Sequence, residues 1–317
     1  MRAMRHRDDK GAVSVVMSLC LVVLFGAAAL VIDGGQIWTA RRQLITATDA
    51  AALAEAQEYA SSAVGCAGLG VDFVDSNYSG AEDVTCTRTG SGTSGTVTVS
   101  ASVTVSHQLA AILGRNSTVV ESSSTASFGA ASAVSGLRPL GLCNGSNGFL
   151  AWQASGHSTT QVFRISYGKD DISACGGAAV PGNWAIIDFN GGSNSNQETT
   201  DWIENGYGGT VEAGTWYEGD PGAFSNSVGV SGLIGETIFL PVFDAAQGNG
   251  ANAQLHIAGF VSVVVYDVKA NGDAADRYLD LQFVSAVAPG RCCEGGALDT
   301  GAFAIGLCRA DDEGDCP

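Results

Sequence analysis

Hydrophobic residues form one unbroken run near the start of the chain and alternate with polar residues further on. The run from Ala12 to Ile32 contains neither a charge nor a proline. At a rise of about 1.5 Å per residue, about 20 such residues cross a hydrocarbon core of about 30 Å. Only a helix satisfies the backbone N–H and C=O groups of a single segment in lipid. The pattern therefore predicts one transmembrane helix, which includes Leu21 and Phe25.

We expect helical structure to continue beyond the apolar run to about residue 60, as one helix or as two collinear ones, with Gly34 and Gly35 able to kink it. From Asp33 to Ala60 the sequence is rich in good helix formers and has no proline. Mostly small apolar residues recur there at steps of three and four: Ile37, Ala40, Leu44, Ala47, Ala51 and Ala54. This stripe has two interpretations, a helix packed on its own domain or a lateral contact with like helices in an assembly.

After the helix, the periodicity changes. Residues 61–80 are rich in Gly and Ser and predict a loop. Alternating β-branched residues predict strands at 96–105 and 118–128, on either side of a short helix at 108–113. Further on we expect short strands separated by turn formers, at 161–167, 184–189, 237–241, 253–266 and 278–288, with a short helix at 199–205.

The predicted fold class is α+β. A long N-terminal transmembrane helix would be followed by a small α+β module and a β-rich extracytoplasmic domain, either a sandwich or a barrel. The expected parts are a cytoplasmic N-terminus, the helix with its extension, the α+β module, the β-rich domain and an acidic Cys-rich tail, at residues 1–11, 12–60, 61–135, 136–290 and 291–317.

Charge predicts the orientation of the helix. Past Arg42 there are 9 basic and 29 acidic residues, a net charge near −20, whereas the N-terminus is weakly basic. The positive-inside rule therefore places the N-terminus in the cytoplasm and the bulk of the chain outside the cytoplasmic membrane. So acidic a portion also argues against binding to nucleic acid, because phosphate contacts need Lys and Arg.

The cysteines favour an oxidising compartment. Apart from Cys20 in the apolar run there are eight, an even number without a C-x-x-C pair, which suits disulfides better than zinc. Proximity suggests Cys66 with Cys86, Cys143 with Cys175, and two bridges among Cys292, Cys293, Cys308 and Cys316. An alternative interpretation of the N-terminus is a secretory signal peptide cleaved near Ala27–Ala29.

Several short segments stand out in the sequence. They are Gly11–Val15 (GAVSV), Leu30–Gly35 (LVIDGG), Arg41–Leu44 (RRQL), Thr48–Ala54 (TDAAALA), Leu109–Gly114 (LAAILG), Asp201–Tyr207 (DWIENGY) and Ile238–Asp244 (IFLPVFD). Together these segments resemble the TadG-like proteins of the TadE/TadG group of Flp (tight adherence) pilus assembly proteins. The resemblance covers about residues 10–60 and extends more weakly downstream.

The resemblance implies a bacterial envelope protein of pilus biogenesis or a related secretion machine, with other pilus-assembly or pilin-like proteins as partners. Assembly through the N-terminal helix would be homo- or hetero-oligomeric. Two features of the family are missing from this sequence. The fifth residue after Gly11 is Val16, where prepilin-like members carry Glu, and the Asp-x-Ser-x-Ser metal motif of longer members is absent.

No motif points to catalysis, and the sequence predicts no cofactor. The histidines His6, His107, His157 and His256 are scattered, so we expect a non-enzymatic protein. The best metal candidate is the oxygen-rich loop containing Asp188, Asn190 and Asp201, although it fails the EF-hand register and is typical of a polar turn. Two alternatives stay open, an envelope hydrolase with an unrecognised site and an extracellular module for calcium or glycan.

Overall fold

The chain begins with a single long helix, α1, which runs from Lys10 to Ser62 in the computed structural model. Its 53 residues include no proline, so no backbone hydrogen bond is lost along its length. The helix passes through Gly34 and Gly35 without a break. The apolar run and its helical extension are therefore one element, the first of the two arrangements that the sequence left open, and the helix does not end at the two glycines.

The structure describes residues 10–62, 66, 68–91, 94–167, 174–175, 183–192, 196–221, 227–248, 252–270, 276–293 and 297–308. The chain divides into two compact units. The first unit comprises residues 1–52, 68–87 and 98–124, and the second comprises residues 53–67, 88–97 and 125–317. Each is described by itself.

The first unit packs α1 against an antiparallel β-hairpin. Its further elements are α2 (Leu69–Asn77), β1 (Glu82–Ser91), β2 (Ser94–Ser106), the 3-10 helix η1 (Ala110–Leu113) and β3 (Ser117–Ser135). The last parts of α1, β1 and β3 and the first part of β2 are assigned to the second unit. Apolar and polar residues alternate along β2, and Val99, Ala101 and Val103 are buried. The predicted short helix at 108–113 is thus a 3-10 turn between two strands.

The helix α2 corrects the expectation of a loop over residues 61–80. Val74 is fully buried, and Gly68, with φ 118°, begins the helix in a conformation that favours glycine. The turn-forming residues at either end of α2 hid this nine-residue helix from the sequence pattern.

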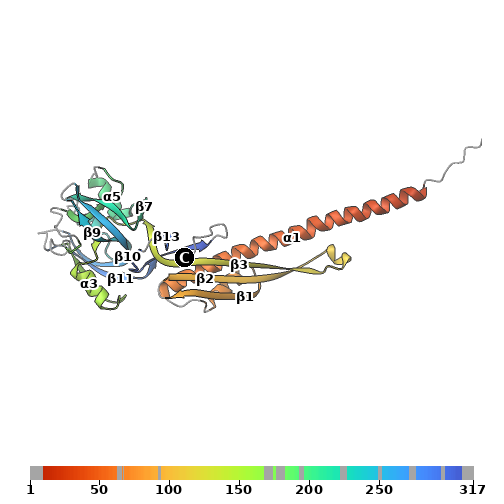
Figure 1. Cartoon of the computed structure of the whole chain (residues 1–317), viewed down its shortest axis with the longest axis horizontal. Helices are drawn as coiled ribbons and strands as arrows, with labels where there is room; N and C mark the ends of the chain where they lie inside the picture. The colour runs from red at the N-terminus through yellow and green to blue at the C-terminus, as the bar shows by residue number, and fades with distance from the viewer. Residues whose placement is uncertain are drawn as a thin grey trace, which may run out of the picture. The chain divides into compact units, whose positions relative to one another are not determined.

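The second unit is mostly β. Its elements are β4 (Leu142–Cys143), α3 (Asn147–Ala154), β5 (Val162–Ser166), β6 (Asn183–Asp188), α5 (Asn196–Asn205), β7 (Thr210–Glu212), β8 (Thr215–Pro221), α6 (Ser227–Ser231), β9 (Thr237–Gln247), β10 (Gln254–Lys269), β11 (Tyr278–Val284), β12 (Ala286–Val287), β13 (Gly290–Cys292) and β14 (Ala302–Cys308). The labelled strands and helices can be followed in Figure 1.

Two seven-stranded sheets account for the named strands of the described residues. One has the order β1-β2-β3-β14-β12, with β13 and β7 also paired to β3. The other has the order β4-β9-β10-β11-β5, with β8 pairing both β10 and β6. One of the two sheets is a half-barrel. The predicted α+β class with a barrel-like β-rich part is confirmed.

Aromatic rings fill the core of the second unit. Phe243, Phe260 and Phe283 are almost fully buried, on β9, β10 and β11. The Trp152 ring of α3 stacks on Phe283 with 4.2 Å between centroids. Because each buried aromatic side chain removes a large apolar area from water, these rings anchor α3 to the sheet.

Several boundaries differ from the sequence expectation: the strand expected at 237–241 extends to Gln247, and the one expected at 278–288 ends at Val284. The helix expected at 199–205 begins earlier, at Asn196. The strand expected to end at Phe128 continues to Ser135, because β13, β14 and β7 supply partners along it. The expected tail is also part of the fold as far as Cys308, since β14 pairs with β3 from Phe303 to Cys308.

Candidate functional site

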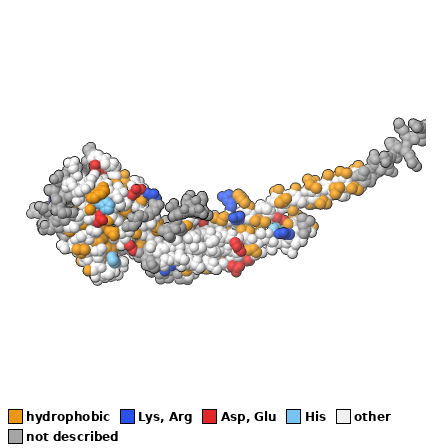
Figure 2. All heavy atoms as spheres, in the orientation of Figure 1, with side chains coloured by type: hydrophobic (Ala, Val, Ile, Leu, Met, Phe, Trp, Pro, Cys, Tyr) orange, Lys and Arg blue, Asp and Glu red, His pale blue; other side chains and the backbone are white. Residues whose placement is uncertain are grey.

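The apolar segment of α1 is the most exposed hydrophobic surface of the described chain. Large apolar side chains from Val13 to Ile32 are between 45% and 79% exposed, and they surround the helix rather than forming one stripe. Figure 2 shows this half of α1 covered by hydrophobic side chains. A helix that is apolar on all sides suits either a protein core or a lipid bilayer, and no described element covers most of this segment.

Asp33, the first residue beyond that segment, ties α1 to the hairpin. Its carboxylate accepts backbone N–H groups of Gln108 at 2.9 Å, Ala110 at 2.7 Å and Leu109 at 3.2 Å. No side chain of η1 itself caps that turn, so Asp33 supplies the cap from the helix. The backbone N–H groups of Ala110 and Gln108 lower the pKa of this carboxyl below its ordinary value, although burial opposes them.

A second tie lies further along the helix, at the TDAAALA segment. The buried hydroxyl of Thr48 lies 2.8 Å from that of Ser124 and 3.0 Å from that of Ser122. The Ser124 hydroxyl donates to the carboxylate of Asp49 at 2.5 Å. One proton assignment satisfies all three contacts: Ser122 donates to Thr48, Thr48 to Ser124, and Ser124 to Asp49. The Ile45 carbonyl, at 3.0 Å, is an alternative acceptor for Thr48.

The small-residue stripe of α1 faces its own unit. Ala40, Leu44, Ala47 and Ala51 are buried, the last three completely. Small side chains let a strand approach the helix closely enough for the Thr48 contact. Of the two interpretations of the stripe, packing within its own unit is the one that these residues adopt.

Aromatic and basic side chains lie just beyond the apolar segment. Trp38 is 61% exposed, and the Arg42 guanidinium lies 4.9 Å from the centre of its ring. Arg41 is exposed as well. Such residues favour the boundary between hydrocarbon and water, where a ring and a charged group are both accommodated.

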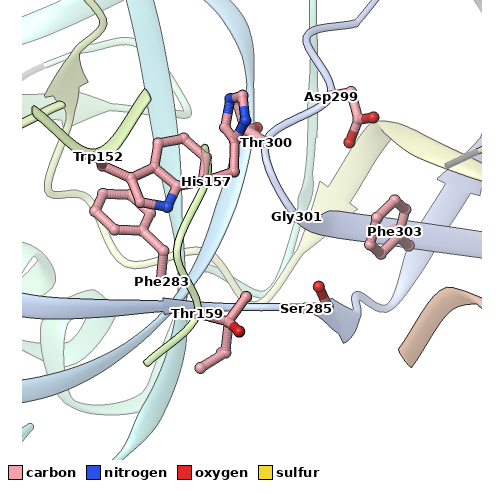
Figure 3. Close-up of a pocket in the computed structure, with 10 residues that line it drawn as sticks. Trp152, His157, Thr159, Phe283, Ser285, Asp299, Thr300, Gly301 and Phe303 are labelled. Atoms are coloured by element: carbon pink, nitrogen blue, oxygen red, sulfur yellow. The ribbon is translucent and has the colours of Figure 1, made fainter. Parts of the chain in front are cut away.

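The second unit contains a cavity of about 180 Å³ next to α3. Its lining combines the stacked rings of Trp152 and Phe283 with polar residues from the ends of β11 and the start of β14, including Ser285, Asp299 and Thr300. His157 lies at its rim and has a φ of 60°. The backbone N–H of His157 donates to the Trp152 carbonyl at 3.2 Å. Figure 3 shows His157 and Asp299 along one side of the cavity, and Ser285 across from them.

These groups do not form a nucleophile–base pair. Among the described residues, no hydrogen bond joins the Ser285 hydroxyl to His157. Partial burial raises the pKa of the Asp299 carboxyl, while the Gly301 N–H and the charge of His157 counteract it. A hydrolase of the serine class needs its nucleophile within hydrogen-bond reach of a base, so side-chain movement would be required first.

The oxygen-rich loop is held by its own hydrogen bonds. The carboxylate of buried Asp188 accepts the backbone N–H groups of Asn190 and Gly191, both at 3.1 Å. Asp201 accepts the side-chain amide of Asn205 at 2.7 Å instead of facing Asp188. Residues 193–195 of the loop lie outside the described residues. N–H donors on the Asp188 oxygen stabilise a turn, and a cation there would have to displace them.

Sequence reasoning missed a partly exposed pair on the sheet that contains β9 and β10. His256 Nδ1 lies 2.6 Å from the Asp244 carboxylate, and the Trp216 ring lies 5.2 Å from the imidazole. The three residues come from β10, β9 and β8, which are adjacent in the sheet. Only strand pairing brings them together, so no local sequence signal marked the group.

The disulfides agree in part with the expected pairs. Cys143 and Cys175 are joined, next to the buried core of the second unit. Cys292 and Cys293 are joined to each other. Cys66, Cys86 and Cys308 are each disulfide-bonded, and Cys316 lies outside the described residues. Cys20 is a free, exposed cysteine in the apolar segment.

These features define a chain with one helix long and apolar enough to cross a membrane and a hairpin unit tied to the continuation of that helix. Residues 11–58 match the model of a family described as "Putative Flp pilus-assembly TadE/G-like". The resemblance of the N-terminal segment to the TadE/TadG group is therefore confirmed by a family match over residues 11–58. No curated protein matches the chain. No solved structure matches it either.

Proposed function

We propose that this chain is a non-enzymatic, membrane-anchored component of Flp-type pilus assembly or a related secretion machine. The helix crosses the cytoplasmic membrane once, with the N-terminus in the cytoplasm. The second unit and the part of the first unit that follows the apolar segment lie outside, where the second unit contacts pilin-like or other assembly proteins.

The observation that carries this proposal is the coincidence of the exposed apolar segment with the Tad match. Residues 11–58 contain the whole apolar segment and both ties, Asp33 and Thr48. Insertion of these roughly 20 apolar residues into lipid removes their surface from water. Without a membrane, the same surface would stay in contact with water. The match supplies the pilus context that the geometry alone lacks.

The orientation is supported by charge and sulfur chemistry. The portion past Arg42 has a net charge near −20, and acidic residues do not retain a segment in the cytoplasm as Lys and Arg do. The Cys143–Cys175 disulfide suits an oxidising compartment outside the cytoplasmic membrane.

A hydrolase remains a second candidate, because one cavity brings together Ser285, His157 and Asp299. The same cavity is small and its hydroxyl is not paired with the histidine among the described residues. The two candidates differ in which residues they require, and this makes them separable by experiment.

The test is complementation in the native bacterium. Deleting the gene should reduce surface pili, and the wild-type chain should restore them. A chain with Leu21→Arg and Val22→Arg, which places two charges in the apolar segment, should not restore them. A chain with His157→Ala and Ser285→Ala should restore them fully. Normal piliation after deletion would contradict the proposal, and failure of the second variant despite normal protein levels would favour the hydrolase.

A further inference from the structure

The turn between β2 and β3 lies beside the point where α1 leaves its apolar segment. We call residues 109–115 the hairpin tip. The His107 N–H donates to the Asn116 carbonyl at 2.8 Å, so the two strands are still paired just before the tip. Asp33 then holds the backbone of Leu109 and Ala110 against the helix. The tip is therefore fixed at the height of Asp33 along α1.

The side of α1 that faces the tip is covered for one more turn into the apolar segment. Ala29 is four residues before Asp33 and therefore on the same face of the helix. It is 8% exposed, whereas its neighbours Leu30 and Val31 are 79% and 75% exposed. Ala29 lies about 4.5 Å inside the end of the apolar segment at 1.5 Å per residue. The first unit thus overlaps the segment that would lie in hydrocarbon.

The tip itself carries an apolar side chain with no protein covering it. Ile112 is 81% exposed, the highest value among the large hydrophobic residues of the described chain. It follows the Asp33 contacts by two residues, before Gly114, with φ 83°, turns the chain back toward β3. Arg115, the next residue, is exposed too. An apolar residue beside a basic one, next to a membrane-crossing segment, matches the chemistry of a lipid surface.

We propose that the hairpin tip is a second membrane contact, in which Ile112 enters the outer face of the bilayer beside α1 and Arg115 meets the phosphate groups of phospholipids. Trp38 and Arg42 continue the same boundary around the helix. The inference rests on the proposed function, since it requires α1 to cross a membrane. Its consequence is that the first unit is held at the bilayer by two points and not by a free helical stalk.

A photo-crosslinking experiment tests this contact in the full chain, reconstituted in bilayers of phosphatidylethanolamine and phosphatidylglycerol. The photoreactive amino acid p-benzoylphenylalanine, which inserts into nearby C–H bonds, replaces one residue at a time. Position 112 reports the tip. Position 25, where Phe25 lies in the apolar segment, reports the anchor. Position 123 is the matched control, because Ser123 is exposed and lies between Ser122 and Ser124, which contact Thr48. Thr48 is about 22 Å further along α1 from the apolar segment than Asp33 is.

We expect lipid adducts, identified by mass spectrometry, at positions 25 and 112, with at least tenfold less adduct at 123. Adducts at 25 together with background levels at 112 would overturn the inference and leave the anchor intact. Background levels at 25 would remove the anchor itself and with it the proposed function. A cross-link from 112 to a second copy of the chain, in place of lipid, would also overturn the inference. Retention of the Cys143–Cys175 disulfide in each variant verifies that the chain has folded.

Discussion

The hydroxyls of Thr48 and Ser124 lie 2.8 Å apart, although 76 residues separate them in the sequence. Thr48 is fully buried on α1, and Ser124 is buried on β3. This contact, continued by Ser124 to Asp49, gives the TDAAALA segment a structural role in joining helix to hairpin.

Replacing Thr48 by Val should weaken the first unit. Val keeps the shape but removes the hydroxyl, so the buried Ser124 and the partly buried Ser122 lose a partner, and the loss at Ser124 costs about 1–3 kcal/mol. Hydrogen exchange of the backbone around Ser124, measured in detergent micelles, should become correspondingly faster. Thr46→Val is the control, because Thr46 is exposed on the same helix and bonds only the Arg42 carbonyl in the described structure. Equal effects of both substitutions would contradict the prediction.

Replacing Asp33 by Asn should loosen the hairpin tip. The amide has one acceptor oxygen where the carboxylate has two, and it loses the charge that attracts the N–H groups of residues 108–110. Hydrogen exchange of these three amides at neutral pH should accelerate. Asp72→Asn, an exposed change on α2, should leave them unchanged.

Acid should remove the difference between the wild-type chain and Asp33→Asn. The pKa of Asp33 is lowered in the folded chain by the backbone N–H groups, so its stabilisation is present above the unfolded-state pKa of about 3.9 and is lost as the pH falls through the folded-state value. The gap between the two thermal midpoints should be constant from pH 7 to pH 5 and close below about pH 4. A gap that persists at pH 2 would argue that the carboxylate charge is not what holds the tip.

Removing the Cys143–Cys175 disulfide should destabilise the second unit. The bridge closes a loop with a sequence separation of 32 residues, for which the loss of loop-closure entropy is about 3–4 kcal/mol. The double substitution Cys143→Ser, Cys175→Ser should lower the thermal midpoint by several degrees, as measured by calorimetry. Cys20→Ser controls for cysteine replacement, since Cys20 is free. A midpoint unchanged by the double substitution would show that the bridge is dispensable.

Regular patterns made the helix and the hairpin predictable. The proline-free apolar run determined α1, and the alternation from Thr96 to Val105 determined β2. Short elements were harder to predict. The run from Ala302 to Cys308 is apolar without a clear period, which does not distinguish strand from helix. It becomes strand β14 because β3 offers it a pairing edge.

The contacts of the candidate site were not predictable in the same way. Nothing near Asp33 in the sequence indicates that its carboxylate will cap a turn beginning at Ala110. The Asp244–His256 pair likewise depends on the register of β9 with β10, which includes a bulge next to His256. Local patterns specify which elements form, whereas side-chain partners depend on how distant elements meet.

The distance in sequence between Thr48 and its partner on β3 imposes a delay during synthesis. At about 5–20 residues per second, a ribosome needs roughly 4–15 s to add the 76 residues between Thr48 and Ser124. Throughout that interval the small-residue stripe of the nascent α1 is not yet covered by the hairpin. Chains synthesised at the same place therefore have a short period in which their α1 helices can pair through this stripe. The period ends when the hairpin of each chain is synthesised and packs on the stripe.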